Sequence, residues 1–358
     1  MLESVSATAA VVQGASGSVM ADHRTPLVRR CWYVAGRGDE FTRQLRERSL
    51  LGESVVLYRT EAGRPVVLQN RCPHRSFPLA KGSLEADAVR CGYHGLAFDS
   101  GGKCVDIPSQ EVIPPRLAIR SYPAVERGPF VWVWMGDPAD ADPGLVPATP
   151  WLASQDWTYA SNYVFLGANY VGLHENLLDL THFTYLHPTT LGTPEYARAP
   201  FQVEAGSETV RISRLVPECD VPAIYRTTGM RGKMSRHTVS EFLTPALHHA
   251  SAVLRDLEAD GVYTVYISHF VTPADQDRTH YWFTFARDFQ IADQAITEFT
   301  ERSALHAFNE DVDALQEIAR MHGSGPDAKR EISLKSDQAG VAARRILRSL
   351  ADREAGPA

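Results

Sequence analysis

Short segments in which apolar and polar residues alternate occupy the chain up to about residue 138. They are rich in β-branched and aromatic residues, and turn residues such as Ala62-Gly63 separate them. A period of two residues places successive side chains on opposite faces of a strand. The segments are SVVLYRT (54–60), PVVLQN (65–70), GLAFDS (95–100) and FVWVWM (130–135). The pattern predicts a small antiparallel β domain over residues 24–138.

The second half of the chain mixes strand-like and helical periods, after a linker rich in Pro, Asp and Gly over 136–150. Strand-like runs cover 156–166, 261–271 and 280–289, and helical stretches lie near 171–186, near 292–322 and, as a basic closing helix, at 342–350. The predicted fold class is therefore α+β, with an all-β first domain and a second domain over 139–358. We interpret residues 1–23 as a disordered leader, with read-through ahead of Met20 as the alternative.

Composition excludes several classes of protein. The chain has 358 residues, a net charge of −7 and 44% hydrophobic residues, which suits roughly two globular domains and argues against a non-specific nucleic-acid binder. No apolar run approaches the ~18 residues needed to span a bilayer, and residues 1–23 lack the pattern of a secretory signal. Five cysteines form no disulfide framework, so we expect a cytoplasmic location, with Cys31, Cys104 and Cys219 as ordinary buried thiols.

Two short stretches each offer one thiolate and one imidazole. Cys72 and His74 lie two residues apart, and Cys91 and His94 follow after a gap of sixteen residues. Four soft or borderline ligands at this spacing can hold Zn²⁺ or an iron–sulfur cluster. The spacing alone therefore leaves a structural zinc site as an alternative to an iron–sulfur centre.

The residues around these ligands resemble the two binding loops of a Rieske [2Fe–2S] domain. The segments are CPHRSFPLAKG and CGYHGLAFD. The resemblance implies that two cysteines bind one iron and two histidines bind the other; these ligands are Cys72, Cys91, His74 and His94. Gly92 and Gly95 would let backbone amides approach the cluster sulfurs, which a Cβ would hinder.

A second group of possible ligands lies in the segment GLHENLLDLTHFTYLHPTTLG. Asp179 and His182 are three residues apart and would share one face of a helix. His187 precedes Pro188, a position that disfavours helical backbone, so the helix should end there. The two imidazoles can then converge on one metal ion.

A carboxylate is expected to complete this second site from the helix near 292–322. An inward stripe on that helix is formed by Ala304, Phe308, Leu315 and Ile318. Asp311 lies on the stripe, and a carboxylate on an apolar face is costly unless a cation pairs with it. Asp313 and Glu310 point elsewhere and are expected to be solvated. Asp311 would complete a two-histidine–one-carboxylate triad, which leaves iron(II) positions open for O₂; an ion pair with a buried arginine is the alternative.

With both ligand groups in place, the chain resembles the oxygenase component of a Rieske non-haem iron oxygenase from about residue 26 to 350. The segments NLLDLTHFTYLHP and FNEDVDALQ most resemble the branch that includes the vanillate and dicamba O-demethylase oxygenases. The resemblance implies a catalytic domain in which helices flank an antiparallel sheet and hold mononuclear iron. It also implies a homotrimer in which the Rieske cluster of one subunit serves the iron of its neighbour.

The resemblance assigns three further residues. Asp179 matches the aspartate that links the cluster-bound His94 of one chain to the iron-bound His182 of another, and its carboxylate is placed to accept a hydrogen bond from His182. Asn176 matches a polar position beside the iron. His269 falls where related demethylases place a substrate-contacting histidine, and a strand histidine packed in the core is the alternative.

The implied activity is O₂-dependent hydroxylation of an alkyl C–H next to O or N of a small aromatic substrate, which demethylates or dealkylates it. Electrons would come from NAD(P)H through a separate ferredoxin or flavin reductase, because the chain has no dinucleotide or flavin motif. The alternatives are hydroxylation of a ring or side-chain carbon with the same metals, a Rieske electron carrier and a zinc-stabilised interaction module. Loops around 195–250 should set specificity. We interpret His248 and His249 as a solvated loop pair, with a place in the pocket lining as the alternative.

Overall fold

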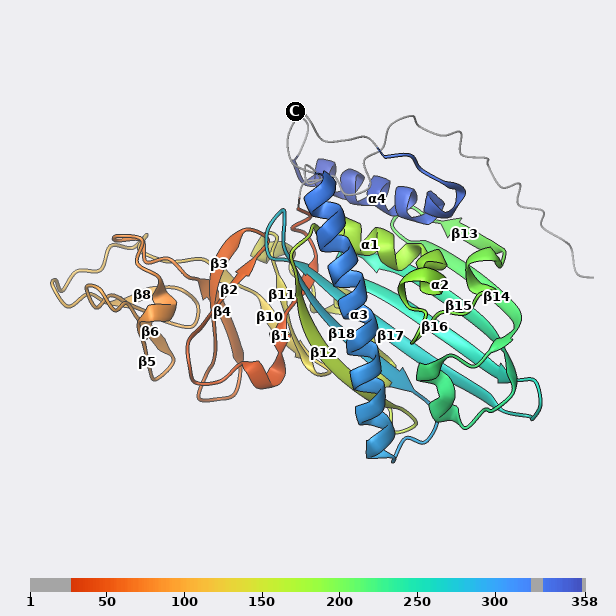
Figure 1. The fold of residues 1–358 in the computed structure, drawn as a ribbon. Helices are drawn as coiled ribbons and strands as arrows, with labels where there is room; N and C mark the ends of the chain where they lie inside the picture. The colour runs from red at the N-terminus through yellow and green to blue at the C-terminus, as the bar shows by residue number, and fades with distance from the viewer. Residues whose placement is uncertain (1–26, 323–330, 356–358) are drawn as a thin grey trace, which may run out of the picture.

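The computed structural model describes residues 27–322 and 331–355, so the predicted leader lies outside the described residues. The first part of the chain folds into three small antiparallel sheets (Figure 1). The first sheet holds β1 (Trp32–Arg37), β11 (Phe130–Trp134) and β10 (Ala124–Arg127). The second holds β2 (Arg46–Leu50), β3 (Glu53–Arg59), β4 (Pro65–Gln69) and β9 (Ser121–Tyr122). The third, at the tip, holds β5 (Ser83–Glu85), β6 (Ala88–Arg90), β7 (Ala97–Phe98) and β8 (Cys104–Asp106).

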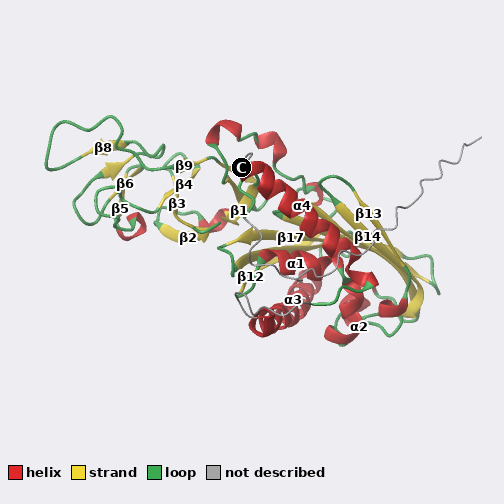
Figure 2. Ribbon diagram, turned by 90° about the horizontal axis from the view of Figure 1, so that it is seen from above, coloured by secondary structure: helices red, strands yellow, loops and turns green. Residues whose placement is uncertain are grey.

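A seven-stranded antiparallel sheet forms the second part, in the order β12-β18-β17-β16-β15-β14-β13. Its strands are β12 (Thr158–Leu166), β13 (Phe201–Ala205), β14 (Val210–Asp220), β15 (Lys233–Thr244), β16 (Leu247–Asp256), β17 (Val262–Pro273) and β18 (Thr279–Arg287). The helices are α1 (Tyr170–Leu178), α2 (Phe183–Leu186), α3 (Gln294–His322) and α4 (Gln338–Ala355). They cover one face of the sheet, as Figures 1 and 2 show. The predicted α+β arrangement is thus confirmed.

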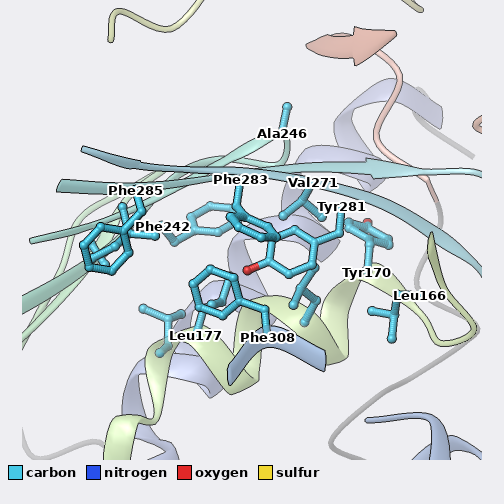
Figure 3. Close-up of a cluster of buried hydrophobic side chains, with 14 of the residues drawn as sticks. Leu166, Tyr170, Leu177, Phe242, Ala246, Val271, Tyr281, Phe283, Phe285 and Phe308 are labelled. Atoms are coloured by element: carbon cyan, nitrogen blue, oxygen red, sulfur yellow. The ribbon is translucent and has the colours of Figure 1, made fainter. Parts of the chain in front are cut away.

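Apolar side chains fill the space between the sheet and the helices (Figure 3). Phe308 of α3 meets Phe283 of β18 edge to face, with ring centroids 4.5 Å apart, and Leu177 of α1 lies in the same cluster. Tyr281 and Phe285 point to this side of β18 as well, because alternate residues of a strand share a face. The core therefore fixes α1 and α3 side by side over the same strands.

The other face of β18 and β17 packs against the first domain. Trp282 of β18 and Phe270 of β17 join an apolar cluster with Trp132 of β11, and the rings of Phe130 and Phe270 lie 4.4 Å apart. Both faces of β18 are therefore covered, which explains why every one of its residues is buried. This interface joins the two domains into one body.

Many elements lie where the sequence predicted them, but the stretch 195–250, expected to be loops, holds β13, β14, β15 and the start of β16. Two further features were placed wrongly. The stretch expected to be one helix over 171–186 is interrupted at Asp179, whose backbone is extended (φ −113°, ψ 91°), so α1 ends before it. Ile318 is 37% exposed and does not belong to the inward stripe of α3, because the buried residues of α3 shift to one side over its last turns. Cys31, Cys104 and Cys219 are buried, as predicted.

His280 ties β18 to the first domain with both ring nitrogens. Its Nε2 lies 2.9 Å from the carbonyl oxygen of Ser49 in β2, and its Nδ1 lies 2.8 Å from the hydroxyl of Tyr163 in β12. Burial, aided by the nearby charge of Arg48, lowers the pKa of His280 from 6.5 to about 4. The imidazole is therefore neutral in the folded protein at neutral pH.

We expect His280 to make folding pH-dependent. Between pH 6.5 and about 4, His280 binds a proton in the unfolded chain but not in the folded chain. The free energy of unfolding therefore falls as the pH falls, by up to about 1.4 kcal/mol per pH unit for one histidine. Urea unfolding at several pH values should give a shallower dependence for His280→Gln than for the wild type. His237 on β15 is exposed, so His237→Gln should keep the wild-type slope; equal slopes for all three proteins would contradict this account.

Candidate functional site

Two loops at the tip of the first domain repeat one backbone pattern. In each loop the cysteine N–H donates to the carbonyl five residues ahead, and its own carbonyl accepts from the N–H four residues ahead. These bonds begin at Cys72 and Cys91 and measure 2.8–3.1 Å. Ser76 (φ 59°) and Gly95 (φ 77°) occupy the equivalent left-handed position. The two loops are therefore matched halves of one structure.

The loops place two thiols inward and two imidazoles outward. Cys72 and Cys91 are buried, whereas His74 and His94 are exposed with ring centroids 4.4 Å apart. Burial and the adjacent Cys91 thiol raise the pKa of Cys72, so a cation is needed to hold the Cys72 sulfur as a thiolate. Two inner thiolates with two outer imidazoles are the donor set of a Rieske cluster, and the residues present fit that group.

Loop packing accounts for the two glycines beside these ligands. A Cβ on Gly92 would lie 3.0 Å from the carbonyl oxygen of Lys81 and 3.3 Å from the Phe77 ring. A Cβ on Gly95 would lie 2.8 Å from Pro108, at a backbone conformation that glycine adopts readily. Each glycine thus lets its loop pack against a neighbouring segment.

The second group of ligands forms where the backbone breaks between α1 and α2. Asp179 caps the next turn, because its Oδ1 accepts from the backbone N–H of Thr181 at 2.9 Å and from its hydroxyl at 2.6 Å. His182 ends that turn, and α2 follows it directly. The helix then stops at His187, before Pro188, as the sequence predicted.

Three donor atoms meet at this break. The Nε2 atoms of His182 and His187 lie 3.4 and 3.1 Å from Oδ1 of Asp311, and the ligand atoms of the three residues lie within 4.8 Å of one another. The Nε2 of His182 is buried and has no hydrogen-bond partner. Asn176 donates to the same Asp311 oxygen at 3.0 Å. A metal ion would satisfy the unpartnered nitrogen and the shared carboxylate, so the residues fit mononuclear iron.

The outer nitrogens of both imidazoles are fixed by acceptors. The Nδ1 of His187 lies 2.7 Å from Oε2 of Glu310, and the Nδ1 of His182 lies 2.6 Å from the backbone carbonyl of Asp179. Such contacts set the tautomer and turn Nε2 toward the metal. Burial favours a higher pKa for Asp311, but the hydrogen bond from His187 and the neighbouring imidazoles hold it below its ordinary value.

These contacts correct two expectations. Glu310 is not solvated, because the turn of α3 that carries Asp311 also brings its carboxylate onto His187. The carboxylate of Asp179 does not accept from His182, because the chain break makes it a cap and presents the backbone carbonyl instead. The arginine expected in the alternative interpretation of Asp311 is replaced by histidines and Asn176.

An apolar cavity adjoins the three donors. His182, Asp311 and His269 line it, so the position proposed for substrate contact is on its wall. The Nδ1 of His269 lies 2.6 Å from the hydroxyl of Tyr281, and burial lowers the pKa of His269 to about 3. Its imidazole is therefore neutral.

The pair His248 and His249 is not a solvated loop. Both residues lie buried on β16, and the Nε2 of His248 lies 2.6 Å from the hydroxyl of Ser240. The sequence analysis also missed Arg236 and Thr238, which line the cavity from β15. The signal was the alternation in MSRHTVSEF, which places Arg, Thr and Ser on one face of a strand.

Comparison with known proteins covers nearly the whole chain. Residues 31–123 match the Rieske [2Fe-2S] domain, and residues 166–353 match the vanillate O-demethylase oxygenase C-terminal domain. The iron-sulfur subunit of a toluene-4-sulfonate monooxygenase system from Comamonas testosteroni is 39% identical over 84% of this chain and 90% of that protein. The vanillate O-demethylase oxygenase subunit of a Pseudomonas strain is 30% identical over 89% and 93%.

A crystal structure of dicamba monooxygenase with 3,6-dichlorosalicylic acid aligns with a TM-score of 0.87 and 27% identity, over 93% of this chain and 100% of that one. Among the described residues, no helix has the length and apolar character to cross a membrane. The names of the relatives identify them as one component of a larger oxygenase system. The chain belongs to the family of Rieske-type monooxygenase oxygenase components, which use a [2Fe–2S] cluster and a mononuclear non-haem iron.

Proposed function

We propose that this protein hydroxylates an alkyl carbon next to O or N of a small aromatic substrate and so demethylates or dealkylates it. The observation that carries the proposal is the meeting of three metal-ligand atoms beside an apolar cavity, which His182 and Asp311 line. Relatives that act on vanillate and a structural neighbour that acts on dicamba support the substrate class. The apolar lining suits one aromatic ring and excludes water from the reacting carbon.

The ligand assignments belong to this proposal. We propose Cys72, Cys91, His74 and His94 for the cluster, and His182, His187 and Asp311 for the iron. When bound, these metals supply electron transfer and the activation of O₂. The protein's own part is to orient both imidazoles through Glu310 and the Asp179 carbonyl, and to hold Asn176 against the Asp311 carboxylate. We propose His269 as a neutral substrate contact.

A second candidate is hydroxylation of a methyl carbon attached directly to the ring. The relative named for toluene-4-sulfonate has 39% identity with this chain, against 30% for the vanillate relative. Toluene-4-sulfonate carries its methyl group on the ring and has no O- or N-alkyl group. The cavity and the metal ligands serve both reactions equally, because each begins by hydroxylating a C–H bond.

The homotrimer with shared sites belongs to the proposal as well. Within one chain the cluster loops lie at the far tip of the first domain, away from α2 and α3, in both overall views (Figures 1 and 2). A neighbouring copy must then bring its cluster to this iron. Asp179 is half-buried, which leaves it accessible to His94 of the partner subunit. We further propose a domain boundary at residue 138, a reducing cytoplasm, and a ferredoxin or flavin reductase that delivers electrons from NAD(P)H.

Product analysis tests the proposed function. The holoenzyme with a surrogate reductase should convert 4-methoxybenzoate with formation of one formaldehyde per substrate. Benzylic alcohol from toluene-4-sulfonate, without formaldehyde from the methoxy compound, would favour the second candidate. Asp311→Ala should abolish either product while the Rieske absorbance is kept. Reduction of the cluster without any oxygenated product from either compound would contradict both candidates.

Glu310 should control how tightly iron binds. Glu310→Gln removes the charge that orients His187, and loss of such a contact typically weakens metal affinity about 10- to 100-fold. Iron content after dialysis against a graded chelator measures the change. Asp313→Asn provides the matched control, because it removes the same charge from an exposed position three residues further along α3. Equal iron retention in the two variants would show that the contact with His187 does not matter.

Asp179→Asn should separate metal binding from communication between the sites. Asparagine keeps the size and the capping oxygen, so both metal centres and the Rieske spectrum should remain. The loss of charge should weaken the contact with His94 of the partner subunit. In a single-turnover experiment the reduced cluster of the variant should then stay reduced after substrate and O₂ are added, while the wild-type cluster reoxidises. Rapid reoxidation with product in the variant would mean that Asp179 is only a cap.

A further inference from the structure

One strand presents a row of polar side chains to the cavity. Arg236, Thr238 and Ser240 alternate along β15, so all three lie on the same face, and all line the cavity beside the metal ligands. Arg236 is 1% exposed and Thr238 is 4% exposed. The rest of the lining is mostly apolar. A buried guanidinium in such a wall requires an explanation, because an uncompensated charge is expensive to bury.

The protein neutralises Arg236 only in part. Its Nη1 donates to the Leu191 carbonyl at 2.8 Å, and its Nη2 donates to the Tyr225 hydroxyl at 3.3 Å. Its charge also lies over three aromatic rings, at 5.3, 4.7 and 5.1 Å from the centroids of Phe183, Tyr196 and Tyr225. The Nε–H is buried and has no hydrogen-bond partner among the residues that the structure describes. Within 27–322 and 331–355, no carboxylate oxygen lies within 4.0 Å of this guanidinium.

A second unsatisfied donor lies beside the first. The hydroxyl of Thr238 is buried and has no hydrogen-bond partner. The hydroxyl of Ser240, by contrast, is engaged by the Leu177 carbonyl and by His248. The two unsatisfied groups are thus confined to one end of the row. Arg214 pairs with Thr238 across β14 and β15, but its guanidinium donates to two backbone carbonyls and does not line the cavity.

We propose that Arg236 and Thr238 form a receptor for the carboxylate or sulfonate group of an anionic aromatic substrate. An aryl oxyanion would accept from the Arg236 Nε–H and from the Thr238 hydroxyl, and so neutralise the charge that the protein leaves uncompensated. The inference rests on the proposed function, because it takes this cavity as the substrate site. It adds the substrate's charge and the residues that select it.

The position of Arg236 also limits the size of the substrate. Its guanidinium covers the ring of Phe183, and that ring lies 5.0 Å, centroid to centroid, from the ring of His182. The receptor and the metal ligands therefore flank a single aromatic side chain. A substrate whose anionic group binds Arg236 needs about one aromatic ring to reach from there to the metal ligands. Its far substituent then meets the site of oxidation.

Binding measurements without turnover test this inference. We would titrate benzenesulfonate, benzoate and neutral benzamide into the holoenzyme by calorimetry, with no reductant present. The wild type should bind the two anions and bind benzamide more weakly. Arg236→Gln should weaken anion binding about 10- to 100-fold, the usual range for a charge-assisted hydrogen bond, and change benzamide binding little. Arg236→Lys, which keeps the charge but loses the Nε–H, should fall between the two.

Two further variants separate recognition from folding. Thr238→Val removes one hydroxyl at constant shape and should weaken anion binding even if the Arg236 variants do not fold. Arg214→Gln is the matched control, because Arg214 is a buried arginine that also stacks on Tyr196 but does not line the cavity. It should leave the preference for anions over benzamide intact. An equal loss of all three ligands in Arg214→Gln and Arg236→Gln would show that Arg236 is only structural.

The outcomes distinguish this inference from the proposed function. Turnover of neutral aromatics, with no Arg236-dependent binding of either anion, would overturn the inference and leave the proposed function standing. Arg236-dependent binding of the anions in an enzyme that oxidises neither methoxy nor methyl aromatics would support the receptor and overturn the proposed function. Absence of binding by all three probes in a correctly loaded holoenzyme would overturn the receptor.

Discussion

The burial of one carboxylate determines the architecture of the catalytic domain. Asp311 lies on the inward side of α3 among aromatic residues, where an unpaired charge is too costly to persist. Its compensation comes from two imidazoles that a regular helix could not bring to one point. The chain therefore breaks at Asp179 and stops again before Pro188, and both irregularities turn Nε2 atoms toward the same oxygen. The sheet and its aromatic core hold α1 and α3 close enough for this to occur.

The need to bring several metal ligands to one point also explains why the two ligand loops of the first domain are so regular. Two thiols and two imidazoles meet at a tip whose own apolar core includes Cys72 and Cys91, so packing and backbone hydrogen bonds together fix their positions. The matched backbone hydrogen bonds at Cys72 and Cys91 hold the two loops in the same conformation. The domain is then anchored far from the tip, through Trp132 and Phe270, to the back of the large sheet. One chain thus carries two metal sites in two packed domains that keep the sites apart.

Much of this could be predicted from the sequence, and the failures have physical reasons. Local patterns predict many strands of the first domain, the strands at 156–166, 261–271 and 280–289, the helices at 292–322 and 342–350, the grouping of His182 and His187 and the end of the helix before Pro188. They did not predict β13 to β16, whose stretch was taken as loops. The capping role of Asp179 could not be predicted, because a continuous helix and a helix that breaks at this residue show the same spacing in the sequence. Glu310 was misjudged because helical position alone does not show which long side chains reach back to a neighbour. His248 and His249 were misjudged because two adjacent polar residues conceal a strand whose two faces are both covered.

The charges around the cavity form a consistent arrangement. Glu310 and Asp311 carry two negative charges at the metal end, and a divalent iron balances both. Burial lowers the pKa of His269 to about 3, so this histidine of the cavity wall adds no charge at neutral pH. Arg236 then remains as the uncompensated cation at the other end. With iron in place the cavity carries a net positive charge that an anionic aromatic substrate would neutralise, so metal loading and substrate binding should favour each other electrostatically.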